Sequence, residues 1–297
     1  MSGRMQGKIC LVTGATAGIG KATALGLARL DARVVIVGRD AGLTEETVKE
    51  LRRESRNSQV ESLVADLSSQ AEVRRLAAAF QQRYDKLDVL INNAGVLLTT
   101  RETTVDGFER TWAVNYLAKV LLTLELLDCI KASRPARIVN VSSKTHFGRT
   151  LDLNNLQGEK GVGMSSYAQT MLSTILFSYA LARRLEGAGV TVNCLHPGVV
   201  STRLMKFTGV KKVLMEIVRP FLLSPAQGAA TSIYLSTSDQ VEGVTGKYFD
   251  KCKAVRSSNV TYDETLQEQL WRLSLRQLRE PRRCSTSLLR PATRAGS

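Results

Sequence analysis

The sequence is poor in aromatic residues, histidine and cysteine, and each shortage narrows what it can encode. Aromatic residues make up 5% of the 297 positions, and there are two histidines. The five cysteines are odd in number and scattered, with no CxxC motif or Cys/His cluster. We therefore predict no metal site and no disulfide framework. Scattered thiols are typical of a reducing compartment, so we predict a cytoplasmic protein.

Long uncharged apolar stretches are also missing. None approaches the roughly 18 to 20 residues needed to cross a bilayer, and a strand-like run begins almost at the N-terminus. We expect neither a transmembrane segment nor a signal peptide. The hydrophobic content of 43% can still form one large core, which Leu, Val, Ala and Ile must build because aromatic side chains are few.

The net charge of +14 comes from 41 basic and 27 acidic residues and is uneven along the chain. No aromatic residues are interleaved with the basic ones, which argues against a nucleic-acid-binding module. Residues 276–297 are rich in arginine and lack periodicity, and we predict that they form a disordered tail. The alternative is an arm that binds nucleic acid or a membrane surface.

Short β-branched runs alternate with helical patterns along the rest of the chain. This alternation predicts a single doubly wound α/β (Rossmann) domain over residues 1–275, with a seven-stranded parallel sheet. We expect a ligand site at the carboxyl ends of the strands. The predicted strands lie within residues 8–14, 33–39, 60–67, 88–95, 136–143, 190–198 and 246–250.

The stretch TGATAGIG, from Thr13 to Gly20, follows the first predicted strand and opens the first predicted helix. Gly14 permits a tight turn, Gly18 lets the backbone approach a pyrophosphate, and Gly20 allows close packing of helix on strand. A structural turn without a ligand is the alternative. The predicted cofactor-binding loop comprises Gly14, Ala15, Thr16, Ala17, Gly18, Ile19 and Gly20.

The second predicted strand ends in VGRD, which bears on the choice of cofactor. Gly38 stands where an acidic residue would hold a ribose 2′-hydroxyl, and Arg39 follows it. A guanidinium can grip a 2′-phosphate, so we predict NADP in preference to NAD. Asp40 complicates this prediction, and Arg39 could instead be an ordinary solvated residue.

Several motifs together resemble those of the short-chain dehydrogenase/reductase family. They are TGATAGIG, NNAG at 92–95, VNVSS at 139–143, Tyr167 and HPG at 196–198. NLQGEK at 155–160 and LARRLEGAGVTVNCLHPGVVSTRL resemble the retinol dehydrogenase branch. The likeness covers about residues 5–275 and implies a nicotinamide-dependent oxidoreductase.

The resemblance implies roles for individual residues. Tyr167 would exchange a proton with the substrate oxygen, Ser143 would bind that oxygen, and Asn115 matches an active-site asparagine. Hydride transfer leaves alkoxide character on the oxygen, so a hydroxyl and a phenol suit the chemistry. Alternatively, each of the three is structural. The implied cofactor contacts are Asp66 at adenine, Asn93, Ala94 and Gly95 along the fourth strand, and Val199 to Thr202 beside the nicotinamide.

The two histidines, His146 and His196, are not assigned to proton transfer, because no relay arrangement is visible around either. A different departure from the family concerns position 171, where the family carries a lysine four residues after the tyrosine. Met171 occupies this position. An ammonium would favour the phenolate of Tyr167, and a thioether cannot.

Loss of that charge predicts an impaired enzyme that favours carbonyl reduction, because oxidation of an alcohol needs the phenolate as base. Rescue by Lys144 or Lys160 is the alternative, although a cation on a loop is rarely preorganised. A further alternative for the whole chain is a non-catalytic NADP-binding protein that acts through a partner.

Residues 206–223 carry an apolar helical face where the family has a substrate lid, so the predicted lid is about 203–223. We therefore expect a lipophilic, retinoid-like or other apolar carbonyl or alcohol as substrate. The same face could instead pack on the core or on a second subunit, and its lysines could meet a membrane surface. The resemblance also allows a homodimer.

Overall fold

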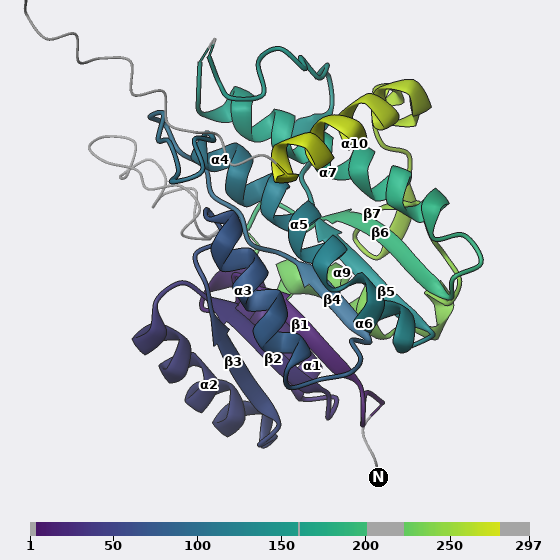
Figure 1. Ribbon diagram of the computed structural model, residues 1–297. Helices are drawn as coiled ribbons and strands as arrows, with labels where there is room; N and C mark the ends of the chain where they lie inside the picture. The colour runs from purple at the N-terminus through teal and green to yellow at the C-terminus, as the bar shows by residue number, and fades with distance from the viewer. Residues whose placement is uncertain (1–3, 160, 201–222, 280–297) are drawn as a thin grey trace, which may run out of the picture.

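The computed structural model describes residues 4–159, 161–200 and 223–279. Eight strands in these ranges form one sheet, in the order β3-β2-β1-β4-β5-β6-β7-β8 (Figure 1). The neighbours from β3 to β7 pair in parallel, and β8 pairs antiparallel with β7. The strands are β1 (Ile9–Thr13), β2 (Arg33–Gly38), β3 (Val60–Val64), β4 (Val89–Asn92), β5 (Ala136–Val141), β6 (Val190–His196), β7 (Tyr248–Asp250) and β8 (Lys253–Val255).

The predicted α/β architecture is confirmed, and each of the seven predicted strands is present. The prediction of a seven-stranded, purely parallel sheet is wrong at one edge, where β8 is added. All three residues of β8 are exposed, so it has no buried face to produce an apolar pattern in the sequence. A short exposed strand is a common way to end a sheet.

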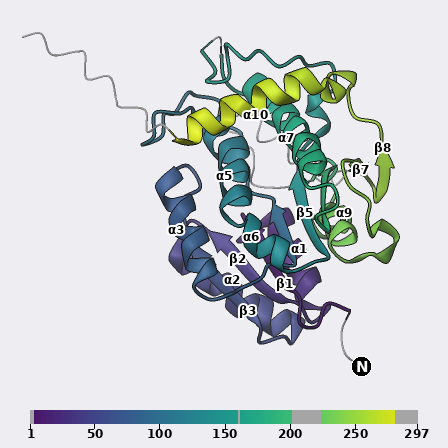
Figure 2. The same cartoon turned by 45° about the vertical axis from the view of Figure 1, so that its right-hand side comes forward.

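The helices lie on both faces of the sheet (Figure 2). α1 packs against α2 and α9 on one side, while α3 packs on α5, and α7 packs on α10, on the other. The helices are α1 (Gly18–Ala28), α2 (Ala41–Ser55), α3 (Gln70–Gln81), α4 (Arg110–Trp112), α5 (Ala118–Glu125), α6 (Leu127–Ala132), α7 (Met164–Arg184), α9 (Pro225–Thr237) and α10 (Glu264–Arg279), with a π-helical turn η1 (Ala113–Leu117) and short 3₁₀ turns η2 (Lys144–His146), η4 (Asp239–Val241) and η5 (Asn259–Tyr262).

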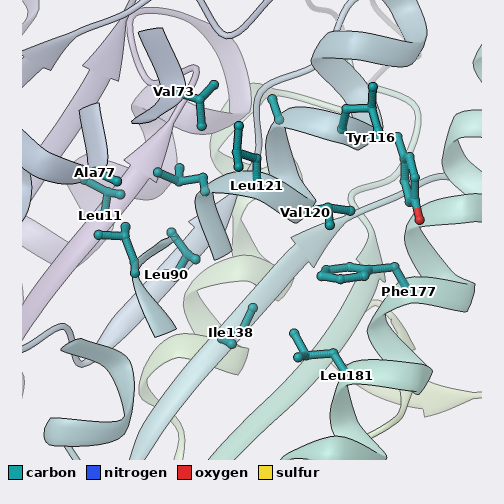
Figure 3. Close-up of a cluster of buried hydrophobic side chains, with 14 of the residues drawn as sticks. Leu11, Val73, Ala77, Leu90, Tyr116, Val120, Leu121, Ile138, Phe177 and Leu181 are labelled. Atoms are coloured by element: carbon teal, nitrogen blue, oxygen red, sulfur yellow. The ribbon is translucent and has the colours of Figure 1, made fainter. Parts of the chain in front are cut away.

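Side chains that alternate along the central strands build two separate cores. On β1, Leu11 belongs to the core under α3, α5 and α7, whereas Cys10 and Val12 belong to the core under α1 and α2. Figure 3 shows part of the first core, where Leu90 lies near Leu11, and Ile138 lies further along the sheet toward Phe177 and Leu181 of α7. Each fully buried side chain of this size contributes roughly 1.5–3 kcal/mol.

The last helix, α10, closes the fold over α7 (Figure 2). Its Trp271 ring stacks on Phe177 of α7 at a centroid distance of 5.5 Å. Leu278 is buried, and Gln277 accepts a hydrogen bond from Trp112 Nε1 at 3.0 Å. The predicted domain boundary at residue 275 therefore falls inside a packed helix. The rest of the predicted tail lies outside the described residues.

The carboxyl ends of β1, β4, β5 and β6 meet at one edge of the sheet. Thr13, Asn92, Val141 and His196 are their last residues. The chain leaves this edge through the glycine loop after β1, the NNAG segment after β4, the two serines after β5 and the HPG turn after β6. These four connections surround the predicted site.

Candidate active site

The glycine loop is shaped by close contact with the end of β4. Gly14 adopts φ +65°, and a Cβ there would lie 2.8 Å from Ala94 Cα. A Cβ on Gly20 would meet Gly14 O and Asn93 Nδ2. Gly18 also has a positive φ, of +56°. Because side chains at these positions would clash or strain the backbone, the sequence needs glycine here for the turn itself.

The amino end of α1 has no side-chain cap. Its N-cap residue is Ala17, which offers no oxygen to the first turn, and that turn contains no acidic residue. By contrast, Asp40 caps α2, Ser69 caps α3 and Ser224 caps α9. Free N–H groups and the helix dipole at such an end suit a phosphate. A purely structural turn would not need an uncapped helix end, so this arrangement fits the pyrophosphate of a dinucleotide.

The NNAG segment after β4 holds the glycine loop. Asn93 Nδ2 donates to Thr13 O at 2.8 Å and to Gly14 O at 3.2 Å. Thr13 Oγ1 accepts from the amides of Asn93 and Ala94 at 3.0 and 3.1 Å. The side chain of Asn93 is thus engaged with the loop backbone, while Gly95 is exposed.

At the end of β2, the neighbouring residues Arg39 and Asp40 have different surroundings. Asp40 Oδ1 accepts from the amide of Leu43 at 2.8 Å and caps α2. A Cβ on Gly38 would meet Thr44 Oγ1 and Thr16 Cγ2, so an acidic side chain at position 38 would require rearrangement. Arg39 is exposed and close enough to Asp66 to lower the pKa of its carboxyl group. Asp40 therefore has a structural role as the cap of α2.

Asp66 lies beside the same loop region. Although burial opposes its ionisation, hydrogen bonds from Ser68 and the charges of Arg110 and Arg39 keep the pKa of Asp66 below its usual range. One carboxylate oxygen accepts from the amide of Ser68 at 2.9 Å, and the other is 3.6 Å from Arg110. The carboxylate is therefore charged and partly engaged by the protein's own groups.

Ser143 and Tyr167 are brought together at the carboxyl end of β5. Burial raises the pKa of Tyr167 to about 12, and a side-chain hydrogen bond with Ser143 opposes part of this rise. Ser143 is 9% exposed, and its Oγ also accepts from the amide of Thr145 at 3.3 Å. The two hydroxyls therefore lie beside each other, as a site that binds and protonates a single oxygen requires.

Asn115 connects the loop after β4 to α7. Its Oδ1 accepts from Val96 N at 2.7 Å, and its Nδ2 donates to Val96 O at 2.8 Å and Thr170 Oγ1 at 3.2 Å. The residue lies in the π-helical turn η1, a distortion often found at functional sites. In this structure Asn115 holds backbone and helix in place near the Ser143–Tyr167 pair.

Met171 is buried, with 3% of its surface exposed. Its carbonyl accepts a hydrogen bond from Ser142 Oγ at 2.9 Å, so this turn of α7 is attached to the end of β5. Lys144 forms an ion pair with Asp250 at 2.8 Å and is half exposed. Lys160 lies outside the described residues. Lys144 is therefore committed to another partner, and no rescue of Tyr167 by it is visible.

Both histidines make hydrogen bonds within the protein. His146 Nε2 accepts from the amide of Ser258 at 3.2 Å, and Nδ1 lies 2.7 Å from Ser143 O, so Nδ1 carries the proton. His196 Nδ1 accepts from the amide of Lys144 at 3.4 Å. Burial lowers the pKa of both residues, that of His196 to about 4. These contacts fit structural roles.

One charged residue near the site was missed in the sequence. Lys119 on α5 is 4% exposed, and its Nζ donates to Val141 O at 2.6 Å. Burial lowers the pKa of Lys119 to about 7. Its position among Ala118, Val120 and Leu121 indicates a buried lysine, but spacing along the chain does not connect it to Tyr167, because the two residues lie on different helices.

The predicted nicotinamide contacts at 199–202 and the predicted lid at about 203–223 lie mostly outside the described residues. Val199 is exposed, and its carbonyl accepts from the amide of Leu223 at 3.0 Å. Thr202 and the predicted lid up to residue 222 lie outside the described residues. Within the described ranges, no helix is both long and apolar enough to cross a membrane. In the same ranges, no three His, Cys, Asp or Glu residues are grouped so as to hold a metal ion.

Comparison with known proteins gives the family of this chain. The family model described as short chain dehydrogenase matches residues 8–212. Retinol dehydrogenase 14 of Homo sapiens is 42% identical over 290 residues, which cover 92% of this chain and 86% of that protein. The chain belongs to the short-chain dehydrogenase/reductase family. Within the family it lies in the retinol dehydrogenase-like branch, and it is a short-chain oxidoreductase.

Other relatives agree with this placement. Retinol dehydrogenase 12 of Mus musculus is 39% identical over 272 residues, covering 91% of this chain and 86% of that protein. Polyprenol dehydrogenase of Homo sapiens is 40% identical over 273 residues, covering 89% and 83%. Among solved structures, the RhlG/NADP active-site complex of Pseudomonas aeruginosa matches with a TM-score of 0.68 at 27% identity, over 84% of this chain and 96% of that one.

Proposed function

We propose that this short-chain oxidoreductase uses NADP(H) to interconvert a lipophilic carbonyl compound and its alcohol, with reduction favoured. The closeness of Ser143 and Tyr167 at the carboxyl end of β5 carries the proposal, because a hydroxyl and a phenol there can act as donor and proton source for one oxygen. The glycine loop and the uncapped amino end of α1, at the same edge, fit the cofactor's pyrophosphate.

In the proposed reaction, bound NADPH supplies the hydride to the carbonyl carbon. Ser143 donates a hydrogen bond to the substrate oxygen, and Tyr167 transfers its phenolic proton to that oxygen as the negative charge develops. The carbonyl is thereby reduced by two electrons, and NADPH is oxidised. Asn115 keeps α7 and the loop after β4 in register, so that the pair faces the cofactor edge.

The preference for reduction follows from Tyr167. With a pKa raised to about 12, only on the order of one phenol in 10⁵ is ionised at pH 7. Reduction uses the abundant neutral phenol, whereas oxidation needs the rare phenolate. Met171 supplies no charge that would change this balance.

The preference for NADP over NAD rests on Arg39. It is exposed at the end of β2, where Asp40 is occupied as a helix cap and Gly38 leaves no acidic group. Arg39→Ala should raise KM for NADPH at least tenfold and change KM for NADH little. Arg53→Ala, an exposed arginine on α2, is the matched control. Equal effects on both cofactors would contradict the assignment.

The substrate class is supported by the relatives and by the predicted lid. The relatives' names specify retinol and polyprenol, which are long apolar alcohols. A lipophilic substrate would be met at a membrane surface, so peripheral contact there is part of the proposal, as are a cytoplasmic location and a homodimer. The four described cysteines are all free, as a reducing compartment would keep them.

The test is a single-turnover screen. Purified protein with NADPH is mixed with retinaldehyde, other apolar aldehydes, ketones and quinones, and NADPH oxidation is followed by absorbance. We expect reduction of at least one apolar carbonyl, with at least a hundredfold loss in Tyr167→Phe and a smaller loss in Ser143→Ala. NADPH binding without any oxidation would instead support a non-catalytic, cofactor-binding protein that acts through a partner.

A further inference from the structure

Lys119 is a buried lysine that the proposed reaction does not yet use. It lies one turn after Asn115 on the helix that follows η1, and its side chain enters the core between α5 and the sheet. The hydrogen bond from its Nζ to Val141 O, at 2.6 Å, is the one made by that ammonium to the described residues. An ammonium has three N–H donors, so two remain available for water or ligand.

The position of the acceptor places Lys119 at the active site. Val141 is the last residue of β5, and Ser142 and Ser143 follow it directly. Ser142 Oγ donates to Met171 O, and Ser143 pairs with Tyr167. The ammonium of Lys119 is therefore held at the end of β5, two residues before Ser143 and next to Ser142, whose side chain reaches α7.

The burial of Lys119 has a physical cost that packing alone does not explain. A buried charge is normally paired, and no carboxylate partner is found for Lys119 in the described residues. The titratable group that acts on it is the thiol of Cys194 on β6. Tyr167 on α7 and His196 on β6 respond to other neighbours, Ser143 in the first case, and Asp250 and Lys144 in the second.

We propose that Lys119 is a positioning residue that supplies, from α5, the active-site positive charge that residue 171 lacks. The inference rests on the proposed function. During reduction Tyr167 loses its proton and becomes negative, and a nearby ammonium in a poorly solvated site stabilises that charge. Lys119 also fixes the end of β5 through Val141, which holds Ser143 against the phenol.

Binding of the two cofactor forms tests the charge without turnover. The positive charge that we propose for this site would disfavour NADP⁺, whose nicotinamide ring is cationic, relative to NADPH. We expect the ratio of the Kd for NADP⁺ to the Kd for NADPH, measured by calorimetry, to be at least threefold higher at pH 6 than at pH 9 in the wild type. Lys119→Met and Lys119→Gln should remove this dependence, whereas Lys144→Gln should keep it.

Kinetics then separate charge from hydrogen bonding. Lys119→Gln retains an N–H donor, so a purely structural role predicts wild-type rates for it, whereas our proposal predicts a loss of at least tenfold in single-turnover reduction at pH 6, as for Lys119→Met. The double variant Lys119→Met/Met171→Lys should recover most of the lost rate. Circular dichroism and NADPH affinity check that each variant is folded.

Failure of the inference about Lys119 and failure of the proposed function give different experimental results. If the wild type binds both cofactor forms but reduces no carbonyl, the proposed function fails, and the Kd ratio still decides the place of Lys119. The assignment is overturned if the pH dependence of the Kd ratio persists in Lys119→Gln, or if it is lost in Lys144→Gln. A wild-type reduction rate in Lys119→Gln also overturns it. A chain that binds neither form overturns both proposals.

Discussion

At the scale of single residues, the active-site pair depends on the electrostatics around one phenol. Burial raises the pKa of Tyr167, and Ser143 offsets only part of this rise. A buried thioether at position 171 leaves that balance unchanged, so the neutral acid dominates. Lys119, on another helix, is a buried cation held at the end of β5, and burial lowers its pKa to about 7.

Restoring the lysine at position 171 should alter oxidation more than reduction. Met171→Lys places an ammonium one turn from Tyr167, which favours the phenolate and moves the pH optimum of alcohol oxidation downward by about one unit or more. We expect oxidation at pH 9 to rise at least tenfold, because Lys119 is neutral there. Steady-state rates from pH 6 to 10 check this prediction. Met171→Leu is the uncharged control, and an unchanged profile in Met171→Lys would contradict it.

The buried lysine should also be visible in stability. Because the folded-state pKa of Lys119 is depressed to about 7, the unfolded chain binds more protons than the folded one between pH 7 and about 10. The free energy of unfolding should therefore rise with pH in this window, by up to about 1.4 kcal/mol per unit, relative to Lys119→Met. Below pH 7 the difference between the two proteins should be constant.

Urea unfolding at pH 6, 7.5 and 9 measures this difference. Lys49→Met, at an exposed lysine on α2, is the matched control and should show no such change. If the free energies of unfolding of wild type and Lys119→Met differ by the same amount at all three pH values, the pKa of Lys119 is not lowered by folding.

At the scale of elements, the site is made by segments that hold one another. The NNAG segment holds the glycine loop through Asn93, and η1 holds the segment after β4 and α7 through Asn115. Ser142 attaches α7 to β5. The connections after β1, β4 and β5 are thus linked by hydrogen bonds, directly or through α7, and a change in one should be felt in the next.

Helix α10 stabilises α7 from outside. Trp271 stacks on Phe177, and the Arg184 guanidinium lies 4.0 Å from its ring centroid. Trp271→Ala should lower the free energy of unfolding by about 2–4 kcal/mol, since it removes a large aromatic contact. Arg272→Ala, at the exposed neighbouring position, should change it by under about 0.5 kcal/mol. Guanidinium denaturation of both variants measures the contrast, and similar losses would show that the stacking is unimportant.

At the scale of the whole molecule, α10 also determines where the fold ends. Gln277 O accepts from Gln70 Nε2 at 3.0 Å, and Leu278 O accepts from Arg74 at 2.6 Å. These contacts connect the end of α10 to α3. A homodimer through the helices that flank β4 and β5 would have to include α10, because it covers the outer side of α7.

Two truncations test this boundary. Removal of residues 276–297 should lower Tm by several degrees more than removal of 280–297, because only the longer deletion removes Gln277 and Leu278. Differential scanning calorimetry compares them with the full chain. If both deletions have the same effect, the end of α10 contributes no stability. Salt-dependent retention of DNA by the full chain alone would revive the nucleic-acid alternative for the tail.

The sequence by itself determined the α/β class, the seven parallel strands and the family, because these depend on local patterns. Apolar runs of strand length, glycines at fixed intervals, and motifs such as NNAG are all readable along the chain. The family assignment and the α/β fold were confirmed. The roles of the individual site residues and the preference for NADP stay predictions.

Tertiary structure decided what depends on contacts between distant segments. It showed that Asp40 is a helix cap, that α10 packs over α7, and that an exposed eighth strand ends the sheet. It also placed Lys119 at the end of β5, 22 positions away in sequence from the residue it contacts. Sequence spacing predicts which residues share one helix face, but not which side chain from another element enters the same site, because that depends on packing across the sheet.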